Sequence, residues 1–210
     1  MTDKKKISIA VIRRLPRYYR YLADLNKAGV QRISSGDLSK RMGVTASQIR
    51  QDLNCFGGYG QQGYGYNIKS LFAEISKILG VNDKFKTIII GAGNIGQALA
   101  HYPNLTARGF DIIAIFDVNP DVVGTKINNV EVLHTDKLES YISKHKTDIA
   151  ILSVPFDQTH ALAERVANSG VKGLWNFSPM DIQIDRDIEI ENVHLTDSLM
   201  VLGYMINHKL

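Results

Sequence analysis

The sequence predicts an α/β protein with a small helical part, residues 1–80, a larger part of alternating strands and helices, residues 81–195, and a last helix, residues 196–210. Three observations predict this organisation. A glycine motif near residue 90 joins a β-branched run to a helical pattern. Strand and helix patterns alternate after it, as in a parallel sheet covered by helices. The charge divides at the same place: residues 1–80 hold 14 Lys and Arg against 5 Asp and Glu, while the remainder holds 11 against 16.

The first predicted element is a helix over residues 8–28. Pro16 lies inside it and indicates either a kink or a second helix that begins there. The apolar positions of the helix are Ile9, Ile12, Leu15, Tyr19, Leu22 and Leu25. Its arginines, which either meet phosphates or are solvated, include Arg14, Arg17 and Arg20. The excess of positive charge in this part of the chain indicates a polyanionic partner.

A helix-turn-helix pattern follows. Two serines begin a short helix that stops at a glycine, and a second helix spans residues 46–56 with Ile49 and Leu53 buried. Thr45 and Gln48 have capping-box spacing, in which Thr45 caps the Gln48 N–H and the Gln48 side chain reaches back. Such a second helix enters the DNA major groove in many regulators, although other helical hairpins never touch DNA. The candidate DNA-binding residues are Ser34, Ser35, Thr45, Ser47, Gln48, Arg50, Gln51 and Asn54.

Residues 57–66 hold five glycines and three tyrosines. This composition predicts either the β-hairpin wing of a winged helix, whose tip lies along a minor groove, or an irregular loop. Gln62 and Tyr64 are the candidate DNA contacts of the wing. A helix from Asn67 to Leu79 and a linker over residues 81–85 complete the N-terminal part.

The glycine motif consists of Gly91, Ala92, Gly93, Asn94, Ile95 and Gly96. In a dinucleotide-binding loop the first glycine permits a tight turn, the second a close approach to pyrophosphate, and the third close packing of the helix. A second β-rich run ends in Asp117, 21 residues after Gly96, where such sites place the acid that binds a ribose 2′-hydroxyl. The pattern predicts a dinucleotide site and favours NAD over NADP. The alternative is a strand-to-helix turn that binds nothing.

Later strand patterns imply a Rossmann-like parallel sheet with its ligand at the carboxyl ends of the strands. Helices are expected to begin near Thr135 and at Asp157 or Thr159. Two segments that follow strands belong near the nicotinamide, unless their prolines only terminate the strands. Their residues are Val154, Pro155, Phe177, Ser178 and Pro179. The last helix is so apolar that it needs a partner surface, either its own sheet or a second subunit.

Composition and motifs exclude several classes. Hydrophobic residues make up 44% and charged residues 22%, as in ordinary globular proteins, and no apolar run is long enough for a membrane span. Because there is no signal-peptide pattern and only one cysteine, Cys55, we expect a cytoplasmic protein without an internal disulfide. No nucleophile elbow or metal-ligand pattern occurs, so we expect neither an enzyme nor a metal site.

Two alternative functions stay open. An NAD-dependent dehydrogenase with a basic N-terminal extension would reduce a carbonyl substrate with NADH, although residues 86–195 leave no room for a substrate domain. A module for another adenine ligand such as CoA is the other alternative, because the glycine loop recognises pyrophosphate. Calorimetry with NADH and CoA would separate these ligands.

Together these motifs resemble the Rex family of redox-sensing transcriptional repressors over essentially the whole chain. The residues that carry the resemblance are Arg14 to Pro16, Tyr18 to Arg20, Ser34-Ser35, Gln48 to Leu53, Phe56-Gly57, Gly63 to Asn67, Gly91 to Gly96, Tyr102 and Asn176 to Pro179. The resemblance implies an N-terminal winged helix, a Rossmann-like domain for NADH or NAD⁺, and a C-terminal helix swapped across a homodimer. It implies repression at a palindromic operator, with release by NADH, and it adds Tyr102 and Asn176 to the nucleotide-binding candidates.

The resemblance also implies a lock that differs between two states of the protein. Its members are Arg20, Tyr102 and an acidic residue near the turn at residues 191–193, where this chain has His194.

Two departures from the family pattern concern DNA. Many relatives carry a second basic residue after Arg50 and another in the wing, where this chain has Gln51 and Gln61-Gln62. Fewer cations predict a shallower salt dependence of DNA binding, because each phosphate that the protein no longer neutralises reduces the slope by about 0.9 logarithmic units.

Overall fold

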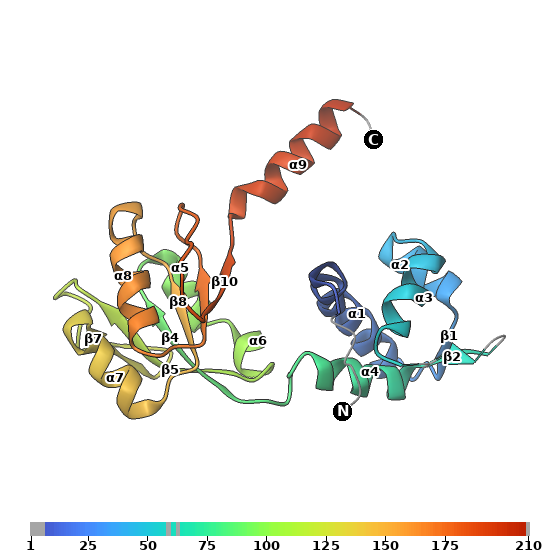
Figure 1. Ribbon diagram of the computed structural model, residues 1–210, viewed down its shortest axis with the longest axis horizontal. Coiled ribbons are helices and arrows are strands. Elements are labelled where there is room, and N and C mark those ends of the chain that lie inside the picture. Colours follow the sequence, from blue (N-terminus) through green and yellow to red (C-terminus); the bar gives the residue numbers. More distant parts are fainter. Residues whose placement is uncertain (1–6, 58–59, 62–63, 209–210) are drawn as a thin grey trace. The chain divides into compact units, whose positions relative to one another are not determined.

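The computed structural model describes residues 7–57, 60–61 and 64–208, so the candidate wing residue Gln62 lies outside the described residues. The chain forms two compact units, Met1–Asn82 and Asp83–Leu210 (Figure 1). Each unit has its own buried apolar core.

The N-terminal unit combines helices with a small antiparallel sheet in the order β1-β3-β2. Its described elements are α1 (Ile9–Lys27), β1 (Arg32–Ile33), α2 (Ser35–Met42), α3 (Ala46–Asn54), β2 (Gly60–Gln61), β3 (Gly65–Asn67) and α4 (Ile68–Ile78). β2 and β3 form the hairpin of the wing. Gly65 is required there, because its φ is +69° and a Cβ atom would collide with the backbone of Ile33.

α1 is a single helix that runs through Pro16. Its buried residues are Val11, Leu15, Tyr18, Leu22 and Leu25, whose alternating spacing of four and three defines one helix face. Three apolar positions of the sequence pattern do not belong to the buried face: Ile9 and Ile12 are exposed, and Tyr19 is only partly buried.

The caps of α2 and α3 arise from short polar side chains. Ser34 Oγ accepts a backbone N–H from the first turn of α2, and Gly43, with a φ of 63°, ends that helix. Thr45 Oγ1 accepts the Gln48 N–H at 3.1 Å, as predicted. The second half of the capping box was wrong, because the Gln48 side chain donates to Asp52 instead. An amide N–H that donates to a carboxylate makes a charge-assisted hydrogen bond, which is stronger than the neutral bond in which the Gln48 oxygen would accept the Thr45 N–H.

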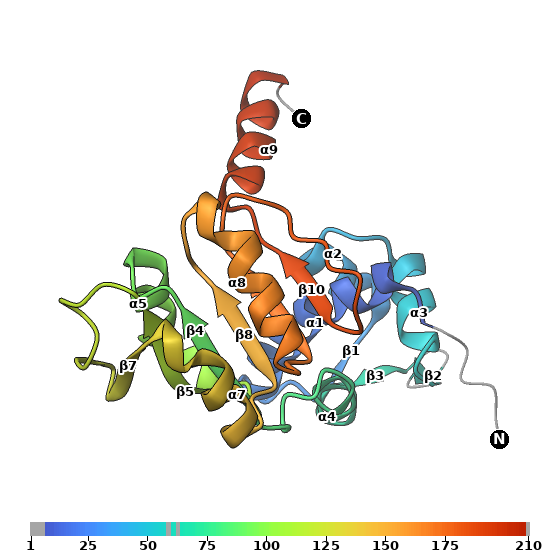
Figure 2. The ribbon, with the colours of Figure 1, turned by 60° about the vertical axis from the view of Figure 1, so that its left-hand side comes forward.

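The C-terminal unit contains a seven-stranded sheet in the order β10-β9-β8-β4-β5-β7-β6 (Figures 1 and 2). All its pairings are parallel except that of β6 with β7. Its described elements are β4 (Phe85–Ile90), α5 (Asn94–Ala100), α6 (Pro103–Thr106), β5 (Phe110–Asp117), β6 (Lys126–Ile127), β7 (Val130–His134), a 3₁₀ turn (Thr135–Lys137), α7 (Leu138–His145), β8 (Ile149–Leu152), α8 (Phe156–Asn168), β9 (Gly173–Asn176), β10 (Glu189–Asn192) and α9 (Leu195–His208).

The two faces of this sheet are covered differently. Ile88 and Ile90 of β4 point to one face, where residues of α7 and α8 complete a large buried core. Ile89 points to the other face, where a smaller core includes Ala100 from the end of α5. Side chains alternate along each strand, so every isoleucine of the run is buried on one face or the other.

Several predicted boundaries were wrong. Phe85 begins β4 rather than ending a linker, and α8 begins at Phe156, directly after Pro155. Residues 189–192 form an edge strand that reaches into the turn expected at residues 191–193; its charged residues Glu189 and Glu191 are usual at a sheet edge, and it is only four residues long. α9, at the red end of the ribbon (Figure 2), begins at Leu195, and none of its residues is buried. None of the described helices is both long and apolar enough to cross a membrane.

Candidate nucleotide cleft and DNA-binding surface

The glycine motif lies where the carboxyl ends of β4, β5 and β8 meet. β4 pairs with both of the other strands, so the loops after all three strands are neighbours. They enclose a cleft of about 520 Å³. The predicted residues that line it are Gly91, Gly93, Asn94, Ile95, Asp117, Val154 and Pro155. The structure therefore brings together most of the residues expected at a pyrophosphate and its ribose.

Each glycine of the motif has a separate structural reason. Gly91 has a φ of +100°, and a Cβ atom there would collide with the Ser153 backbone. A Cβ atom on Gly96 would collide with the Gly91 carbonyl, so Gly96 permits the close packing of α5 on the loop. A Cβ atom on Gly93 would meet nothing within 4 Å. Internal packing does not require a glycine at Gly93, and the space beside it fits a ligand that approaches the backbone closely.

Asp117 joins the end of β5 to the glycine motif. Its Oδ2 accepts the Ala92 N–H at 2.6 Å and its Oδ1 accepts the Asn119 N–H at 2.8 Å. A carboxylate offers about four lone-pair positions, so each oxygen retains one for a ribose hydroxyl. Its negative charge would repel a 2′-phosphate.

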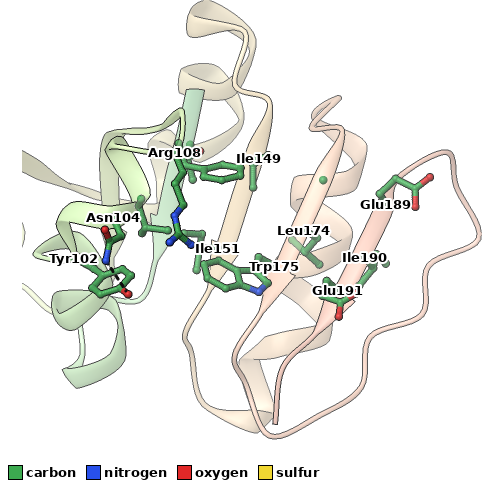
Figure 3. Close-up of a pocket in the computed structure, with 14 residues that line it drawn as sticks. Tyr102, Asn104, Arg108, Ile149, Ile151, Leu174, Trp175, Glu189, Ile190 and Glu191 are labelled. Carbon is green, nitrogen blue, oxygen red and sulfur yellow. Dashed lines mark hydrogen bonds between the residues drawn. The ribbon is translucent and has the colours of Figure 1, made fainter. Parts of the chain in front are cut away.

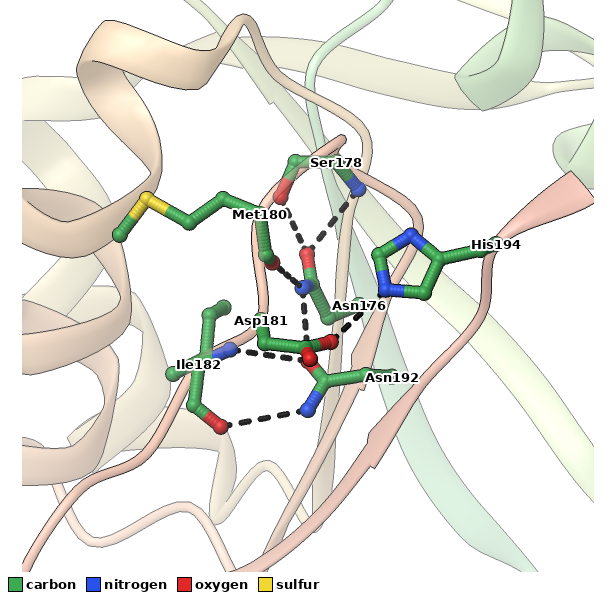
Figure 4. A network of polar contacts seen from close by, with 7 residues as sticks. All are labelled: Asn176, Ser178, Met180, Asp181, Ile182, Asn192 and His194. Atoms are coloured by element: carbon green, nitrogen blue, oxygen red, sulfur yellow. Dashed lines mark hydrogen bonds and ion pairs between the residues drawn. The ribbon is translucent and has the colours of Figure 1, made fainter. Parts of the chain in front are cut away.

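Asn176 lies outside the lining of the cleft, in a polar network (Figure 4). Its side chain is fully buried, and its Nδ2 donates to Met180 O at 2.6 Å and to Asn192 Oδ1 at 2.8 Å. Its Oδ1 accepts both the backbone N–H and the hydroxyl of Ser178. Because these bonds use all four hydrogen-bonding positions of the amide, Asn176 holds the loop after β9 in place.

The loop after β9 is also fixed to the neighbouring strand. The Phe177 N–H donates to Leu152 O at 2.8 Å, and the Phe177 ring packs edge-on against Trp175. Pro179 is exposed and does not line the cleft. This loop therefore lies beside the end of β8, next to the cleft.

Tyr102 lies at a different place from the cleft. It precedes α6, is 50% exposed, and lines a second pocket of about 490 Å³ (Figure 3). The walls of this pocket are largely apolar and include Ile151, Leu174 and Trp175. Thr87 and Ile151 point away from the core that α7 and α8 cover, so the pocket lies on the opposite, open face of the sheet.

In the N-terminal unit, two of the candidate DNA-binding residues bind a buried carboxylate. Asp52 of α3 accepts bonds from Arg14 Nε and Nη2, both at 2.7 Å, and from Gln48 Nε2 at 2.8 Å. Tyr18 OH donates to the same carboxylate at 3.0 Å. Burial alone would raise the pKa of Asp52, but these hydrogen bonds outweigh it and hold the pKa below its usual value.

The outward face of α3 carries the remaining candidates. Ser47, Arg50, Gln51 and Asn54 are exposed. Arg50 Nη1 donates to Ser35 Oγ at 3.0 Å, which joins α3 to the first turn of α2. This face therefore presents a guanidinium, two amides and a hydroxyl, the groups that pair with base edges and phosphates.

Two further candidates flank this surface. Tyr64 of the wing is 69% exposed, and the Arg32 guanidinium lies 5.9 Å from the centre of its ring and donates to its carbonyl. Arg17 is exposed on α1, and its Nη2 lies 4.0 Å from where a Cβ of Gly43 would stand, beside the turn between α2 and α3. Arg32 was missed, because nothing in the local sequence pairs it with a tyrosine 32 positions away.

The three residues of the expected lock are divided between the units. Arg20 is exposed in the N-terminal unit, whereas Tyr102 and His194 belong to the C-terminal unit. His194 precedes α9 and its Nε2 lies 2.7 Å from Asp181 Oδ1 (Figure 4). This hydrogen bond raises the pKa of His194.

Sequence reasoning missed several residues that line the cleft, among them Ser153, Thr135 and Gln158. Ser153 directly precedes the predicted Val154, so the rule that ligands lie at the carboxyl ends of strands could have found it. Gln158 lies in the first turn of α8, and no sequence pattern distinguishes it from an ordinary exposed residue.

Comparisons with known proteins agree with both units. Residues 6–54 match a family model described as "Putative DNA-binding protein N-terminus", and residues 82–180 match one described as "CoA binding domain". The redox-sensing transcriptional repressor Rex of Thermoanaerobacter pseudethanolicus is 53% identical over 209 residues, which cover 100% of this chain and 93% of that protein. The Rex repressor of Clostridium botulinum is 54% identical and covers 99% of both chains.

Solved structures give the same result. A structure of RSP in complex with β-NAD⁺ and operator DNA is 52% identical, with a TM-score of 0.91 over 97% of this chain and 94% of that one. RSP in complex with β-NADH is 49% identical, with a TM-score of 0.91 over 98% of this chain and 96% of that one.

A winged helix joined in one chain to a Rossmann-like sheet with a dinucleotide-type glycine loop defines a DNA-binding regulator controlled by a nucleotide. The sequence identity to the Rex repressors extends over the full length of the chain and specifies the family of this regulator. The chain belongs to the Rex family of redox-sensing transcriptional repressors.

Proposed function

We propose that this chain represses transcription by binding operator DNA through its N-terminal unit, and releases the operator when its cleft binds NADH, with NAD⁺ as competitor. One observation carries the proposal: the open space at Gly93, between the turn of Gly91 and the packed Gly96, is a cradle that a pyrophosphate fits. Asp117 stands beside it with acceptor positions for a ribose. The nicotinamide ring differs in charge and shape between NADH and NAD⁺, and this difference would allow the protein to distinguish the two when either is bound.

The proposed division of labour follows the expected domains. Residues 1–80 bind DNA, residues 81–195 bind the nucleotide, and residues 196–210 join two chains. The cleft residues hold the pyrophosphate and ribose, and the loop after β9 lies towards the nicotinamide half, with Asn176 as its internal anchor. The exposed face of α3 reads the bases, while the start of α2, Arg17 and the wing contact the backbone.

We infer that NADH acts by its differential affinity for two global states of the protein. A ligand shifts such an equilibrium only by that difference, and nearly complete switching needs roughly a 10⁴-fold ratio. The proposed lock between the states consists of Arg20, Tyr102 and His194. The acidic residue of the family pattern carries a negative charge. His194, in contrast, is either neutral or, when protonated, positively charged.

The working form is proposed to be a homodimer. α9 exposes a row of large apolar side chains, Leu199, Leu202 and Ile206 among them, each more than half exposed. The same unit leaves one sheet face open at the apolar pocket of Trp175 (Figure 3). If each chain inserts α9 against its partner, both apolar surfaces are covered. A two-fold dimer suits a palindromic operator, and the proposed location is the cytoplasm.

The test is DNA binding measured by fluorescence anisotropy with genomic fragments at one stated salt concentration, titrated separately with NADH, NAD⁺ and CoA. Release by NADH, with NAD⁺ opposing it and CoA without effect, is expected. Nucleotide binding without retention of any DNA fragment would overturn the proposal and lead to dehydrogenase assays. Release by CoA alone would assign the cleft to a different adenine ligand.

A further inference from the structure

Asp52 is the only acidic residue on α3, the proposed recognition helix, and it points away from the DNA-binding face. Its side chain is fully buried, and four hydrogen bonds reach its two oxygens. Three of them come from α1, two from Arg14 and one from Tyr18, and the fourth comes from Gln48 on α3 itself. A buried carboxylate is costly unless it is paired in this way, so the four groups act as a unit.

The geometry of this unit constrains direction as well as distance. Arg14 binds both carboxylate oxygens through Nε and Nη2 at 2.7 Å, the fork arrangement that only a planar guanidinium makes. Tyr18, itself fully buried in α1, adds a third donor from one turn further along that helix. Such a bidentate pair resists rotation of α3 about its own axis relative to α1.

α1 and α3 share the buried apolar core of the N-terminal unit, where Leu15 and Leu22 lie with Ile49 and Leu53. Apolar packing has no preferred direction, and the Asp52 cluster adds directed hydrogen bonds between α1 and α3 to it. Ser47, Gln51 and Asn54 lie on the opposite side of α3 and are exposed. A rotation of α3 would therefore displace the groups that meet base edges.

We propose that Asp52 is a positioning residue for operator recognition, which fixes the angle of α3 against α1, and that Arg14 and Gln48 bind Asp52 rather than DNA. This inference rests on the proposed function. Base readout demands precise placement, whereas contacts to phosphates tolerate displacement. Loss of the Asp52 cluster should therefore lower operator affinity more than affinity for unrelated DNA.

The experiment measures the ratio of operator affinity to affinity for a scrambled duplex, by anisotropy at one salt concentration, for Asp52→Asn and Arg14→Lys. Both variants keep side-chain size but break the fork. Urea unfolding gives the folded fraction of each. Arg14→Lys guards against the case in which Asp52→Asn fails to fold. Asp24→Asn, which makes the same change at an exposed aspartate of α1 that has no proposed role in DNA binding, is the matched control.

We expect the affinity ratio to fall about tenfold in Asp52→Asn and Arg14→Lys, roughly the effect of removing one base contact, and to stay within about twofold in Asp24→Asn. A direct phosphate contact by Arg14 would survive replacement by lysine, so an unchanged ratio in folded Arg14→Lys overturns the inference. A mere loss of stability would lower both affinities together and also overturns it. If the wild-type chain binds no operator at all, the proposed function fails instead.

Discussion

The Ala92 N–H donates to Asp117 Oδ2 at 2.6 Å, and this bond joins the glycine motif to the end of β5. The two residues are 25 positions apart, and their contact places a carboxylate beside the cleft from a neighbouring strand. The same side chain thus braces the loop and retains acceptor positions for a ribose. Its removal should affect both.

Asp117→Ala is expected to lower NADH affinity by about tenfold or more, because a hydrogen bond to a charged group contributes roughly 1.5–3 kcal/mol. Isothermal titration calorimetry with NADH and NADPH measures the change. NADPH affinity should fall less than NADH affinity, since the repulsion of a 2′-phosphate is also removed. Asp121→Ala, at an exposed residue of the following turn, is the control. Equal NADH affinity in the Asp117 variant would remove this residue from the site.

The two glycines Gly93 and Gly96 should separate ligand binding from stability. A methyl group at Gly93 meets open space, so Gly93→Ala should keep the thermal midpoint within a few degrees while it lowers NADH affinity. Gly96→Ala drives a methyl group into the Gly91 carbonyl and should destabilise the chain by about 1–3 kcal/mol. Thermal unfolding and calorimetry on both variants test this. A Gly93→Ala variant with full affinity would show that no ligand approaches its backbone.

Arg50→Ala is expected to weaken operator binding by about 1–3 kcal/mol and to leave NADH affinity unchanged. Arg50 is exposed on α3 and is held by Ser35, so its loss removes a placed donor without opening the core. Operator affinity, measured by anisotropy at several salt concentrations, shows whether Arg50 contacts a phosphate or a base. A reduced slope of affinity against salt indicates a phosphate contact, and an unchanged slope indicates a base contact. Lys77→Ala on α4 is the control, and unaltered operator binding by Arg50→Ala would move the DNA-binding surface elsewhere.

How much the sequence predicts depends on how local each feature is. The roles of Gly91 and Gly96, the cap at Thr45 and the end of β5 at Asp117 follow from short motifs whose geometry is nearly fixed. The partners of Asp52 lie up to 38 positions away and depend on how α1 packs, so Arg14 looked like a free cation. Burial turned two apparent DNA contacts into internal hydrogen bonds.

Partners that are distant in the sequence also explain why the internal hydrogen bonds of the loop after β9 were not predicted. Ser178 was expected near the nicotinamide because it follows a parallel strand, and the family resemblance added Asn176. The structure gives Asn176 a partner on β10, Asn192, and β10 itself, a strand of only four residues, was not predicted. A polar side chain can be assigned to a ligand only once its internal partners are known.

The pair of His194 and Asp181 predicts a pH dependence of stability. The hydrogen bond raises the pKa of His194 in the folded chain above its unfolded value of about 6.5, and Asp197 adds to this effect. The contribution of the pair is therefore complete below about pH 6.5 and is lost as the pH rises through the raised pKa. The thermal midpoint of the wild type should fall towards that of His194→Gln across this range. His160→Gln, at an exposed histidine of α8, is the control, and parallel curves for wild type and His194→Gln would contradict the prediction.

The exposed apolar face of α9 leads to the last prediction. Leu202→Asp places a charge among side chains that lie more than half exposed in one chain but would be buried between two, so the variant should be monomeric by sedimentation at micromolar concentration. Because α9 takes no part in the cleft, NADH affinity should remain within about threefold. Operator affinity should fall by at least about a hundredfold, since a monomer engages only one half-site. Asp197→Ala, at a polar residue of the same helix, should remain dimeric. A dimeric Leu202→Asp variant with normal operator binding would mean that α9 does not join the two chains.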